Sequence, residues 1–562
     1  MRLSDFIRRD KAILTETDRV VALDQVWDYP DAEAWADARW GLPGSGWTFR
    51  SVQAQALYVM ARCRGLLAPI GVGHGKTLVS WLAPDALGVD RAVIMMPPRD
   101  VVPYNREVVK YQSGFRYEQG AGVQVVPYSI LSATNSSALL DEYKPQAIIC
   151  DEAHCLADPD SVRTRRFLRY MEEHPETLFV AMSGTLYKKS ITDVAHLSRL
   201  ALRELSPMPR GGEDLALWAR ILDVRGCAEA HEYAWFESSV TKYMHVSEEI
   251  PGKIARARKA AYIRLASSPG VVTTETASCD AQLTIRRVDL PVPEHLRLLI
   301  QQVKASREAP DGEDIYATEA HHVTAMRNIA SGFYYKWDWN AIGGRNDDWL
   351  MRRTAWLREL TNELARHSKV NYDSPALVAN KIDQELGKNP GLADQFMLYF
   401  ARAKWNEVAH LPEPPRVTVW LDKYLIDFAM LRYPDDPVIF WYDSIAIEEE
   451  LRARGLTCYG RASYLTGPER RLAASVNAHG QGRNLQDWSH AVVLEPSMGG
   501  SVWEQLLGRL HRGGQTRTVT YDLLVAGELF EASLNNARKD ARFIEDMSGS
   551  PQRLLSSVWE DA

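Results

Sequence analysis

Short apolar runs alternate with amphipathic stretches from about residue 47 to residue 205. The most apolar of these runs have the length of strands: 65–68, 92–96, 123–126, 147–150 and 178–181. Strands that are apolar on both sides are typical of a parallel sheet covered by helices on both faces. The pattern therefore predicts an α/β lobe at residues 45–209, preceded by an N-terminal extension at residues 1–44.

The pattern changes after about residue 210. Long amphipathic stretches rich in Trp, Arg and Glu, for example 349–366 and 393–409, fill most of residues 210–415, and a strand pattern at 283–288 interrupts them. Short apolar runs between helices return at 438–441, 456–459, 472–476, 491–494 and 518–523. The expected fold class is α/β, with two parallel-sheet lobes, 45–209 and 416–562, and a mostly helical insertion at 210–415 between them. The tail after Met547 is expected to fray.

Composition narrows the class of protein. With 46% hydrophobic and 25% charged residues the chain matches soluble globular proteins, and no apolar run approaches the roughly 20 residues of a membrane span. The first ten residues lack the apolar core of a secretion signal, so we expect a cytoplasmic protein without membrane contact. The six cysteines form no C-x-x-C pair, which favours buried thiols over a zinc site or a disulfide framework. The net charge of −7 requires that any nucleic-acid contact come from local basic surface and backbone amides.

A glycine-rich loop follows the strand predicted at 65–68. Its sequence is Gly71-Val72-Gly73-His74-Gly75-Lys76-Thr77, and a helical pattern begins at Leu78. In a phosphate-binding loop the glycines let backbone N–H groups surround the phosphates, the lysine reaches the β- and γ-phosphate oxygens, and the threonine binds Mg²⁺. The loop therefore predicts binding of ATP and Mg²⁺ by Gly73, Gly75, Lys76 and Thr77, although Ile70 replaces the usual first glycine. A glycine-rich turn with a chance lysine is the alternative.

Two adjacent carboxylates end another predicted strand. The run Ile148-Ile149-Cys150 leads into Asp151-Glu152-Ala153-His154. An acidic pair on a buried strand needs a charge partner, which metal-bound ATP would provide. We therefore expect Asp151 to bind Mg²⁺ and Glu152 to act as the general base on the attacking water. An exposed acidic loop is the alternative.

These motifs, followed by Ser183-Gly184-Thr185, resemble the first lobe of superfamily 2 helicases of the DEAH-lettered kind. The resemblance implies that each lobe has a RecA-like fold and that the chain is a motor driven by ATP. Residues 49–53 (FRSVQ) are similar to the family's adenine-sensing motif, which would make Gln53 a contact of the base. Pro97-Pro98-Arg99 and Tyr128-Ser129 are similar to first-lobe motifs that hold the nucleic-acid backbone.

The second lobe resembles the Swi/Snf-type ATPases within that superfamily. Residues 480–486 (GQGRNLQ) look like motif V, residues 505–515 (QLLGRLHRGGQ) look like motif VI, and residues 327–333 are similar to the stretch before the family's second lobe. Two features depart from the family: residues 498–500 (MGG) replace a Trp-Asn-Pro turn, and the link between Tyr459 and Leu472 is short. Compact phage-encoded relatives look similar in both respects, so the resemblance implies a phage or prophage protein that acts in the cytoplasm of a bacterial host.

The resemblance also implies roles for residues outside the phosphate loop. Arg509 and Arg512 lie three positions apart in what reads as the start of a helix, so both could reach across the cleft as arginine fingers, with Gln505 beside the nucleotide. A solvated basic helix face is the alternative for these arginines. Coupling between the nucleotide and the nucleic acid would fall to His154, Ser183, Thr185, Gly482 and Asn484.

Basic clusters and aromatic residues extend the list of candidate nucleic-acid contacts beyond Pro97, Arg99, Tyr128 and Ser129. The basic residues form two groups, Arg163, Arg165, Arg166 and Arg169, and Lys253, Arg256, Arg258 and Lys259. Solvated helix faces explain such runs more often. Trp337 and Trp339, beside Tyr334 and Tyr335, could stack on bases, but core packing is favoured.

The expected function is an ATP-dependent translocase or helicase that moves along DNA in phage replication, recombination or repair, as a monomer rather than a ring. Duplex DNA, including branched or forked DNA, is favoured because the H-R-x-G-Q ending is specific to the Swi/Snf group, whose members mostly move on duplexes. An RNA helicase is one alternative. An ATP-binding scaffold without motor activity is another, which the full set of Lys76, Asp151, Glu152 and Arg512 disfavours.

Overall fold

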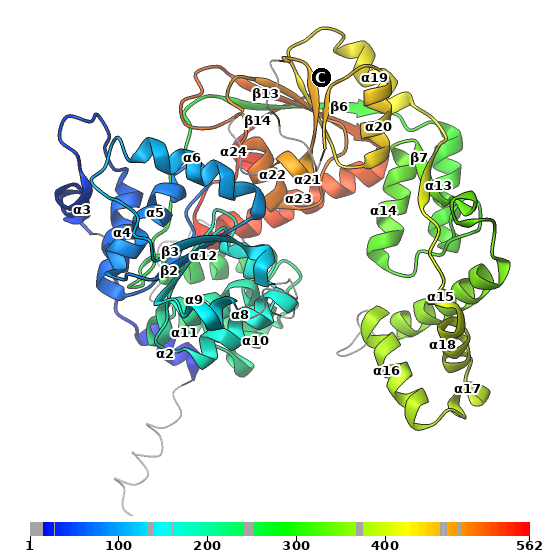
Figure 1. Ribbon diagram of the computed structural model, residues 1–562, viewed down its shortest axis with the longest axis horizontal. Coiled ribbons are helices and arrows are strands. Elements are labelled where there is room, and N and C mark those ends of the chain that lie inside the picture. Colours follow the sequence, from blue (N-terminus) through cyan, green and yellow to red (C-terminus); the bar gives the residue numbers. More distant parts are fainter. Residues whose placement is uncertain are drawn as a thin grey trace, which may run out of the picture.

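The computed structural model describes residues 15–26, 29–131, 139–159, 161–240, 252–366, 375–460, 465, 469–480 and 485–561 (Figure 1). These residues form two parallel sheets and one two-stranded antiparallel sheet, with helices packed around them. The predicted α/β class with two parallel sheets is confirmed. Within the described part of the chain, no helix is both long enough and apolar enough to cross a membrane.

The first sheet has the strand order β1-β5-β4-β2-β3, and all neighbouring strands are parallel. Its strands are β1 (Leu66–Ala68), β2 (Ala92–Met96), β3 (Val123–Pro127), β4 (Ala147–Asp151) and β5 (Leu178–Met182). Alternate residues face two separate cores, with Val93 and Ile148 on one side of the sheet and Ile94 and Ile149 on the other. This burial on both faces is why the strands read as continuous apolar runs, and all five predicted strands are confirmed.

Helices cover both faces of the first sheet. One face packs against α3 (Ala32–Trp40), α4 (Ser51–Cys63), α5 (Lys76–Leu87) and α6 (Val101–Tyr111). The other face packs against α2 (Glu16–Ala22), α7 (Leu139–Tyr143), α8 (Val162–Glu173), α9 (Thr192–Leu202), α10 (Gly212–Leu222), α11 (Ala230–Ser239) and α12 (Lys253–Ala266). The α10–α12 helices, predicted as part of the insertion, therefore share the core of the first lobe.

The second sheet has the order β10-β11-β9-β12-β13-β6-β14, again with parallel neighbours. Its strands are β6 (Leu283–Leu290), β9 (Ile439–Tyr442), β10 (Cys458–Tyr459), β11 (Leu472–Ser475), β12 (His490–Val493), β13 (Val519–Ala526) and β14 (Val558–Asp561). The sheet draws β6 from the segment predicted as an insertion, because β6 pairs with β13 along its whole length. The prediction of a frayed tail is wrong, because β14 pairs with β6 at the edge of the sheet.

Helices also surround the second sheet, and the buried side chains on both of its faces form one core with them. The helices of this part are α13 (Glu294–Ser306), α14 (Glu319–Ala330), α19 (Tyr424–Arg432), α20 (Ile445–Ala453), α21 (Val476–His479), α22 (Gly500–Leu507), α23 (Gly527–Ser548) and α24 (Arg553–Ser556). Most of them lie close to the sheet in Figure 1.

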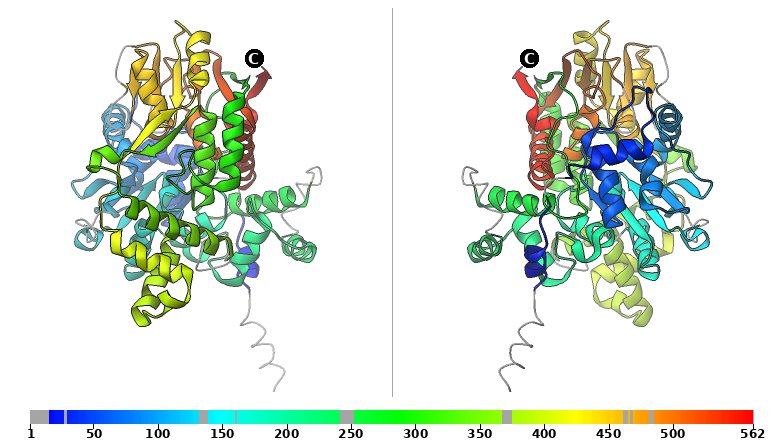
Figure 2. Two further views of the ribbon diagram at one scale, coloured as in Figure 1. Left: turned by 90° about the vertical axis from the view of Figure 1, so that its right-hand side faces the viewer. Right: turned by 90° about the vertical axis from the view of Figure 1, so that its left-hand side faces the viewer.

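A group of helices stands apart from both sheets in Figure 1, and Figure 2 shows the same group from its own side (left) and from the opposite side (right). The antiparallel strands β7 (Phe333–Trp337) and β8 (Arg416–Trp420) lead out to it and back. The group consists of α15 (Asp347–Arg366), α16 (Pro375–Lys388), α17 (Leu392–Gln395) and α18 (Met397–Val408). Trp337 is buried and packs edge-to-face on Trp349 with ring centroids 6.0 Å apart, so it is a core residue, as was favoured over base stacking.

One continuous helix, α23, joins the two lobes. Phe530 and Leu534 near its start belong to the core of the second sheet, whereas Phe543 and Met547 near its end belong to the core of the first. Arg258 on α12 fixes this end: its guanidinium lies 3.4 Å from the Asp546 carboxylate and 4.9 Å from the centre of the Phe543 ring. The two lobes are therefore held side by side at a packed junction.

Candidate active site

The predicted phosphate-binding loop connects β1 to α5. Gly75 caps the N-terminus of α5 with φ of +77°, and an added Cβ there would lie 2.2 Å from Nε2 of Gln53, so only glycine fits. The buried Lys76 side chain turns back over the loop, where Nζ donates to the carbonyl oxygens of Ile70 at 3.2 Å and Gly71 at 3.4 Å. The first backbone N–H groups of α5 lack partners within the helix, and together with Lys76 they suit an anion.

Gln53 and Arg50 brace the phosphate loop from the segment that opens α4. Gln53 Nε2 donates to the carbonyl of His74 at 3.0 Å, and Gln53 Oε1 accepts from the backbone N–H of Arg50 at 3.0 Å. Arg50 Nη1 donates to the carbonyl of Gly73 at 2.7 Å. Gln53, predicted as a contact of the adenine base, thus contacts the phosphate loop here, and Arg50 is a loop contact that the sequence reasoning did not single out.

The acidic pair lies at the carboxyl end of β4. Glu152 Oε1 is 3.9 Å from Lys76 Nζ, and Glu152 Oε2 is 3.1 Å from Nδ1 of His154. Because β5 lies between β1 and β4, the loop that follows β5 emerges beside both the phosphate loop and the acidic pair. From it Ser183 Oγ donates to Glu152 Oε2 at 2.9 Å, and Thr185 Oγ1 lies 3.4 Å from His154 Nδ1. The three predicted coupling residues His154, Ser183 and Thr185 therefore meet at Glu152.

Burial and neighbouring charges shift the pKa values of Asp151 and Glu152 in opposite directions. Burial, with the neighbouring Glu152 carboxylate, raises the pKa of Asp151 well above its usual range. Burial acts in the same direction on Glu152, but the Lys76 ammonium and the contacts with His154 and Ser183 outweigh it and hold the pKa of Glu152 well below its usual range. Glu152 is therefore ionised, whereas Asp151 would gain from a nearby cation. A carboxylate oxygen with this need is the kind of ligand that Mg²⁺ prefers.

Two arginines of the second lobe approach the phosphate loop. An added Cβ at Gly73 would lie 3.9 Å from Cγ of Arg512. Arg509 and Arg512 lie in a turn after α22, in which the His511 N–H donates to the carbonyl of Leu507 at 3.1 Å. The prediction that these arginines begin a helix is therefore wrong: α22 ends before them, at its C-cap Gly508.

Arg509 is buried beside two carboxylates. Its Nε donates to the carbonyl of Gln505, a buried residue of α22, at 2.8 Å. Burial and the positive charge of Arg512 lower the pKa of Arg509 to about 9, while Asp100 and Glu152 act in the opposite direction. Asp100 follows β2, and burial raises its pKa to about 6. It was missed in the sequence because a lone aspartate after a strand carries no signal of its own.

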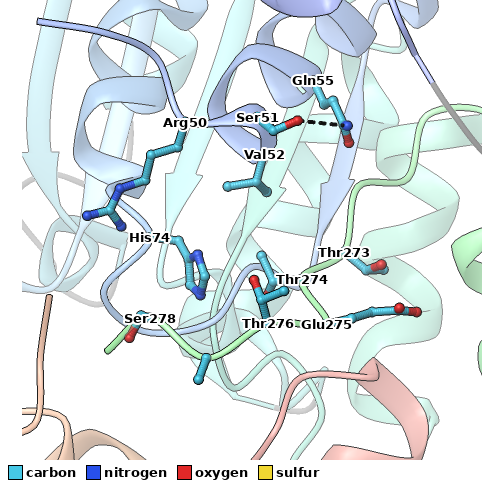
Figure 3. A pocket seen from close by; sticks show the side chains of 11 residues that line it. Arg50, Ser51, Val52, Gln55, His74, Thr273, Thr274, Glu275, Thr276 and Ser278 are labelled. Atoms are coloured by element: carbon cyan, nitrogen blue, oxygen red, sulfur yellow. Dashed lines mark hydrogen bonds between the residues drawn. The ribbon is translucent and has the colours of Figure 1, made fainter. Parts of the chain in front are cut away.

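A cavity of about 400 Å³ opens beside the phosphate loop (Figure 3). Its lining comes from three segments: residues 50–55 at the start of α4, His74 of the loop, and residues 273–278 between α12 and β6. Figure 3 shows His74 in the middle of this group, with Arg50 on one side and Thr274 and Thr276 on the other. Thr274 Oγ1 also accepts from the backbone N–H of Gly71 at 2.8 Å, so this connection is part of the site. No pattern in the sequence marks it.

Several of the residues predicted to contact nucleic acid donate hydrogen bonds to other parts of the protein instead. Tyr128 is buried and its hydroxyl donates to the carbonyl of Asp151 at 2.9 Å, so it supports the acidic pair instead. Pro97 is buried at the end of β2, whereas Ser129 is exposed. Arg166 donates to the carbonyl of Leu131 at 3.0 Å, and Arg99 donates to the carbonyl of Asn477 in the second lobe at 3.1 Å.

The basic group on α8 remains at the surface. Arg165 and Arg169 are exposed and Arg163 is half-buried. Burial and Glu152 raise the pKa of the Cys155 thiol to about 11, and the charges of Arg163, Lys188 and Arg99 oppose the rise. In the other basic group, Arg258 is not available to phosphates, because it is buried against Asp546 and Phe543.

The remaining predicted coupling residues, Gly482 and Asn484, lie outside the described residues. Within the described ranges, no three His, Cys, Asp or Glu side chains are grouped so as to hold a metal ion. No protein-family model matches this chain, and no curated protein is significantly similar to it. The interpretation of the site therefore depends on its own geometry.

Proposed function

We propose that the chain is an ATP-dependent DNA translocase of superfamily 2, in which two RecA-like lobes bind one ATP between them. The observation that carries this proposal is the approach of Arg512 to Gly73, with a 3.9 Å separation between Cγ and an added Cβ. The first lobe offers backbone amides and Lys76 to a phosphate chain, and the second lobe brings the side chain of Arg512 beside the same loop, where its guanidinium would meet the phosphates. Complementary groups from two lobes at one anion site are what hydrolysis of ATP requires.

The groups of the site fit the steps of ATP hydrolysis. Lys76 would exchange its bonds to the Ile70 and Gly71 carbonyls for the β- and γ-phosphate oxygens. Glu152, kept ionised by its neighbours, would accept the proton of the attacking water. Mg²⁺ held by Thr77 and Asp151 would neutralise phosphate charge when bound. Arg512 and Arg509 would stabilise the charge on the transferred phosphoryl group.

The cavity beside the loop suits the base and ribose of the nucleotide. Its volume of about 400 Å³ lies within the usual range of small-molecule sites, roughly 300–1,000 Å³. Arg50 and Val52 supply a cation and an apolar surface that can contact a flat ring, and Thr276 and Ser278 supply hydroxyl groups. Since Gln53 is engaged with the loop, recognition of the base would fall to these residues and to the backbone.

The same residues would connect the bound nucleotide to the bound DNA. His154, Ser183 and Thr185 contact Glu152 directly or through one another, and Lys188 follows shortly after Thr185 in the chain. Lys188 and Arg163, with the exposed Arg165 and Arg169 of α8, would then supply the cations that contact the phosphates of a nucleic acid. Loss of the γ-phosphate on hydrolysis would therefore alter the contacts to DNA. Alternation between the ATP-bound state and the state after hydrolysis would then move the protein along the DNA.

Measurement of ATP hydrolysis with four additions tests this proposal: no nucleic acid, duplex DNA, single-stranded DNA and RNA. We expect duplex DNA to give the largest stimulation. The affinity for duplex should fall linearly in log K against log salt, because the contacts go to phosphates. Stimulation by RNA alone would favour an RNA helicase, and nucleotide binding without hydrolysis under any condition would favour a scaffold.

A further inference from the structure

The C-terminal segment passes through the proposed nucleotide site. Helix α23 ends in the core of the first lobe, where Phe543 and Met547 are buried. The chain then turns at Gly549, passes the phosphate loop, and finishes as β14 at the edge of the second sheet. On this path Ser550 Oγ would lie 2.9 Å from a Cβ added to Gly71, so the segment lies directly against the loop.

Arg553 in this segment joins three parts of the site. Its Nη2 donates to the carbonyl of Val72 in the phosphate loop at 3.3 Å and to Ser278 Oγ in the connection between the lobes at 2.7 Å. Its Nη1 donates to the Glu504 carboxylate on α22, and its Nε donates to Nδ1 and to the carbonyl of His511, each at 3.2 Å. Arg553 is 7% exposed, so these bonds are shielded from water.

The bonds to His511 tie Arg553 to the loop that carries Arg512. His511 Nε2 lies 2.6 Å from the carbonyl of Ala281, and Nε2 must be the donor there. Nδ1 of the neutral ring is therefore the acceptor that Arg553 Nε needs. At Gly508, an added Cβ would lie 3.2 Å from Cγ1 of Val72 and 3.5 Å from Cζ of Arg553, so the phosphate loop, Arg553 and the end of α22 meet at this glycine.

We propose that Arg553 is a positioning residue that fixes the distance between the phosphate loop and the Arg512 loop, and that it acts on hydrolysis through Arg512. The inference rests on the proposed function. The guanidinium fork is suited to this role because it can bond to several acceptors in one plane at once. Arg553 contacts the phosphate loop, the connection at residues 273–278 and the loop that carries Arg512. This set of partners points to positioning rather than to general stability.

The test combines Arg553→Lys with Arg512→Ala in a double-mutant cycle. Lysine keeps the positive charge opposite Glu504 but cannot bridge Val72, Ser278 and His511. We expect kcat to fall about 10²-fold, since a misplacement of about 1 Å can have that effect, while ATP affinity changes by less than about threefold. In the Arg512→Ala background, Arg553→Lys should change kcat by less than about twofold. Arg542→Gln, an exposed residue on α23, is the matched control.

Two readouts separate positioning from a merely structural role. A lysine variant that lowers kcat by equal factors in both backgrounds, or that leaves kcat unchanged, would overturn the inference. Ser278→Ala, which removes one contact of Arg553 without touching Glu504, should reproduce a weaker form of the kcat loss, and an unchanged kcat in this variant would also count against it. If the wild-type chain does not hydrolyse ATP, the proposed function itself fails, which is a distinct result.

Discussion

His74 is buried within the phosphate loop among positive charges, which keeps its imidazole neutral. It is 7% exposed, and burial, followed by Lys76, Arg50 and Arg553, lowers its pKa from 6.5 to about 4. Because the His74 ring is neutral, the positive charge around the loop comes from Lys76, Arg50 and Arg553. Protonation would add a further cation to this group of positive charges, so the folded state resists it.

The pKa of His74 predicts a loss of stability in mild acid. Between pH 6.5 and pH 4 the unfolded chain binds a proton at this residue that the folded chain does not, so the free energy of unfolding falls as the pH falls through that window. The full effect, reached only below pH 4, is about 3.5 kcal/mol at about 1.4 kcal/mol per pKa unit, and part of it is lost by pH 5. Urea unfolding of wild type and His74→Gln at pH 7.5, 6 and 5 measures it. The difference between the two proteins should change with pH, and the exposed His231→Gln should leave the wild-type curve unchanged.

Variants of Lys76 and Glu152 should separate the proposed binding of ATP from its hydrolysis. Lys76→Ala removes the cation that would meet the phosphates, so nucleotide affinity should fall steeply. Glu152→Gln keeps the contact with Ser183 but removes the base, so ATP should still bind while single-turnover hydrolysis falls by about 10²-fold to 10⁴-fold. Fluorescent-nucleotide binding and single-turnover assays measure the two effects. The exposed Lys110→Ala and Glu172→Gln are the controls, and near-normal turnover by Glu152→Gln would remove it as the base.

At the scale of elements, the helices and strands that can be predicted from the sequence are those whose residues are nearly all in the same burial state. Strands β1 to β5 are readable because nearly every residue of four of them is buried, so sequence composition and burial agree. Strands β7 and β8 were missed because their side chains are mixed in burial and their pairing is antiparallel. Strand β14 is short, polar and mostly exposed, and it exists because β6 offers it an edge. Such a strand depends on a partner far away in sequence, which no local pattern contains.

The difference between local and distant partners also explains which residues of the site could be predicted from the sequence. Lys76, Asp151 and Glu152 could be predicted because each belongs to a short motif whose spacing reflects its chemistry. Arg553 could not, because its partners Val72 and Ser278 come from distant segments and only the folded chain brings them together. The turn that carries Arg509 and Arg512 was mistaken for a helix start, since a spacing of three positions fits both structures.

At the scale of the whole molecule, the proposed site lies where the lobes are tied together. Helix α23 crosses from one core to the other, and Lys189 lies 3.7 Å from Asp540 on it. The linker at 273–278 and the C-terminal segment both pass the phosphate loop. A change in the distance between the lobes would therefore move the two segments that border the proposed nucleotide site, as the proposed conversion of hydrolysis into movement requires.

Arg512 gives the decisive test of this two-lobe arrangement, because it belongs to the second lobe and can affect hydrolysis only across the junction. Replacement by alanine should leave ATP affinity nearly unchanged, since Lys76 and the loop amides remain. It should lower kcat by about 10³-fold to 10⁵-fold, the usual contribution of an arginine finger. Lysine at this position should restore little, because a single ammonium cannot reproduce the planar fork that contacts two phosphate oxygens.

The control for this prediction is Arg517→Ala in the loop that follows. Arg517 is exposed and donates to the carbonyls of Gln486 at 3.0 Å and Asp487 at 2.6 Å, so its loss removes a charge of the same kind without touching the phosphate loop. Steady-state hydrolysis and nucleotide affinity would be measured for wild type, Arg512→Ala, Arg512→Lys and Arg517→Ala, each with saturating duplex DNA. DNA binding without nucleotide should be similar in all four, because the proposed role of Arg512 is toward the bound nucleotide and not toward DNA. If Arg512→Ala hydrolyses ATP at the rate of Arg517→Ala, the second lobe does not complete the active site, and the motor interpretation fails with it.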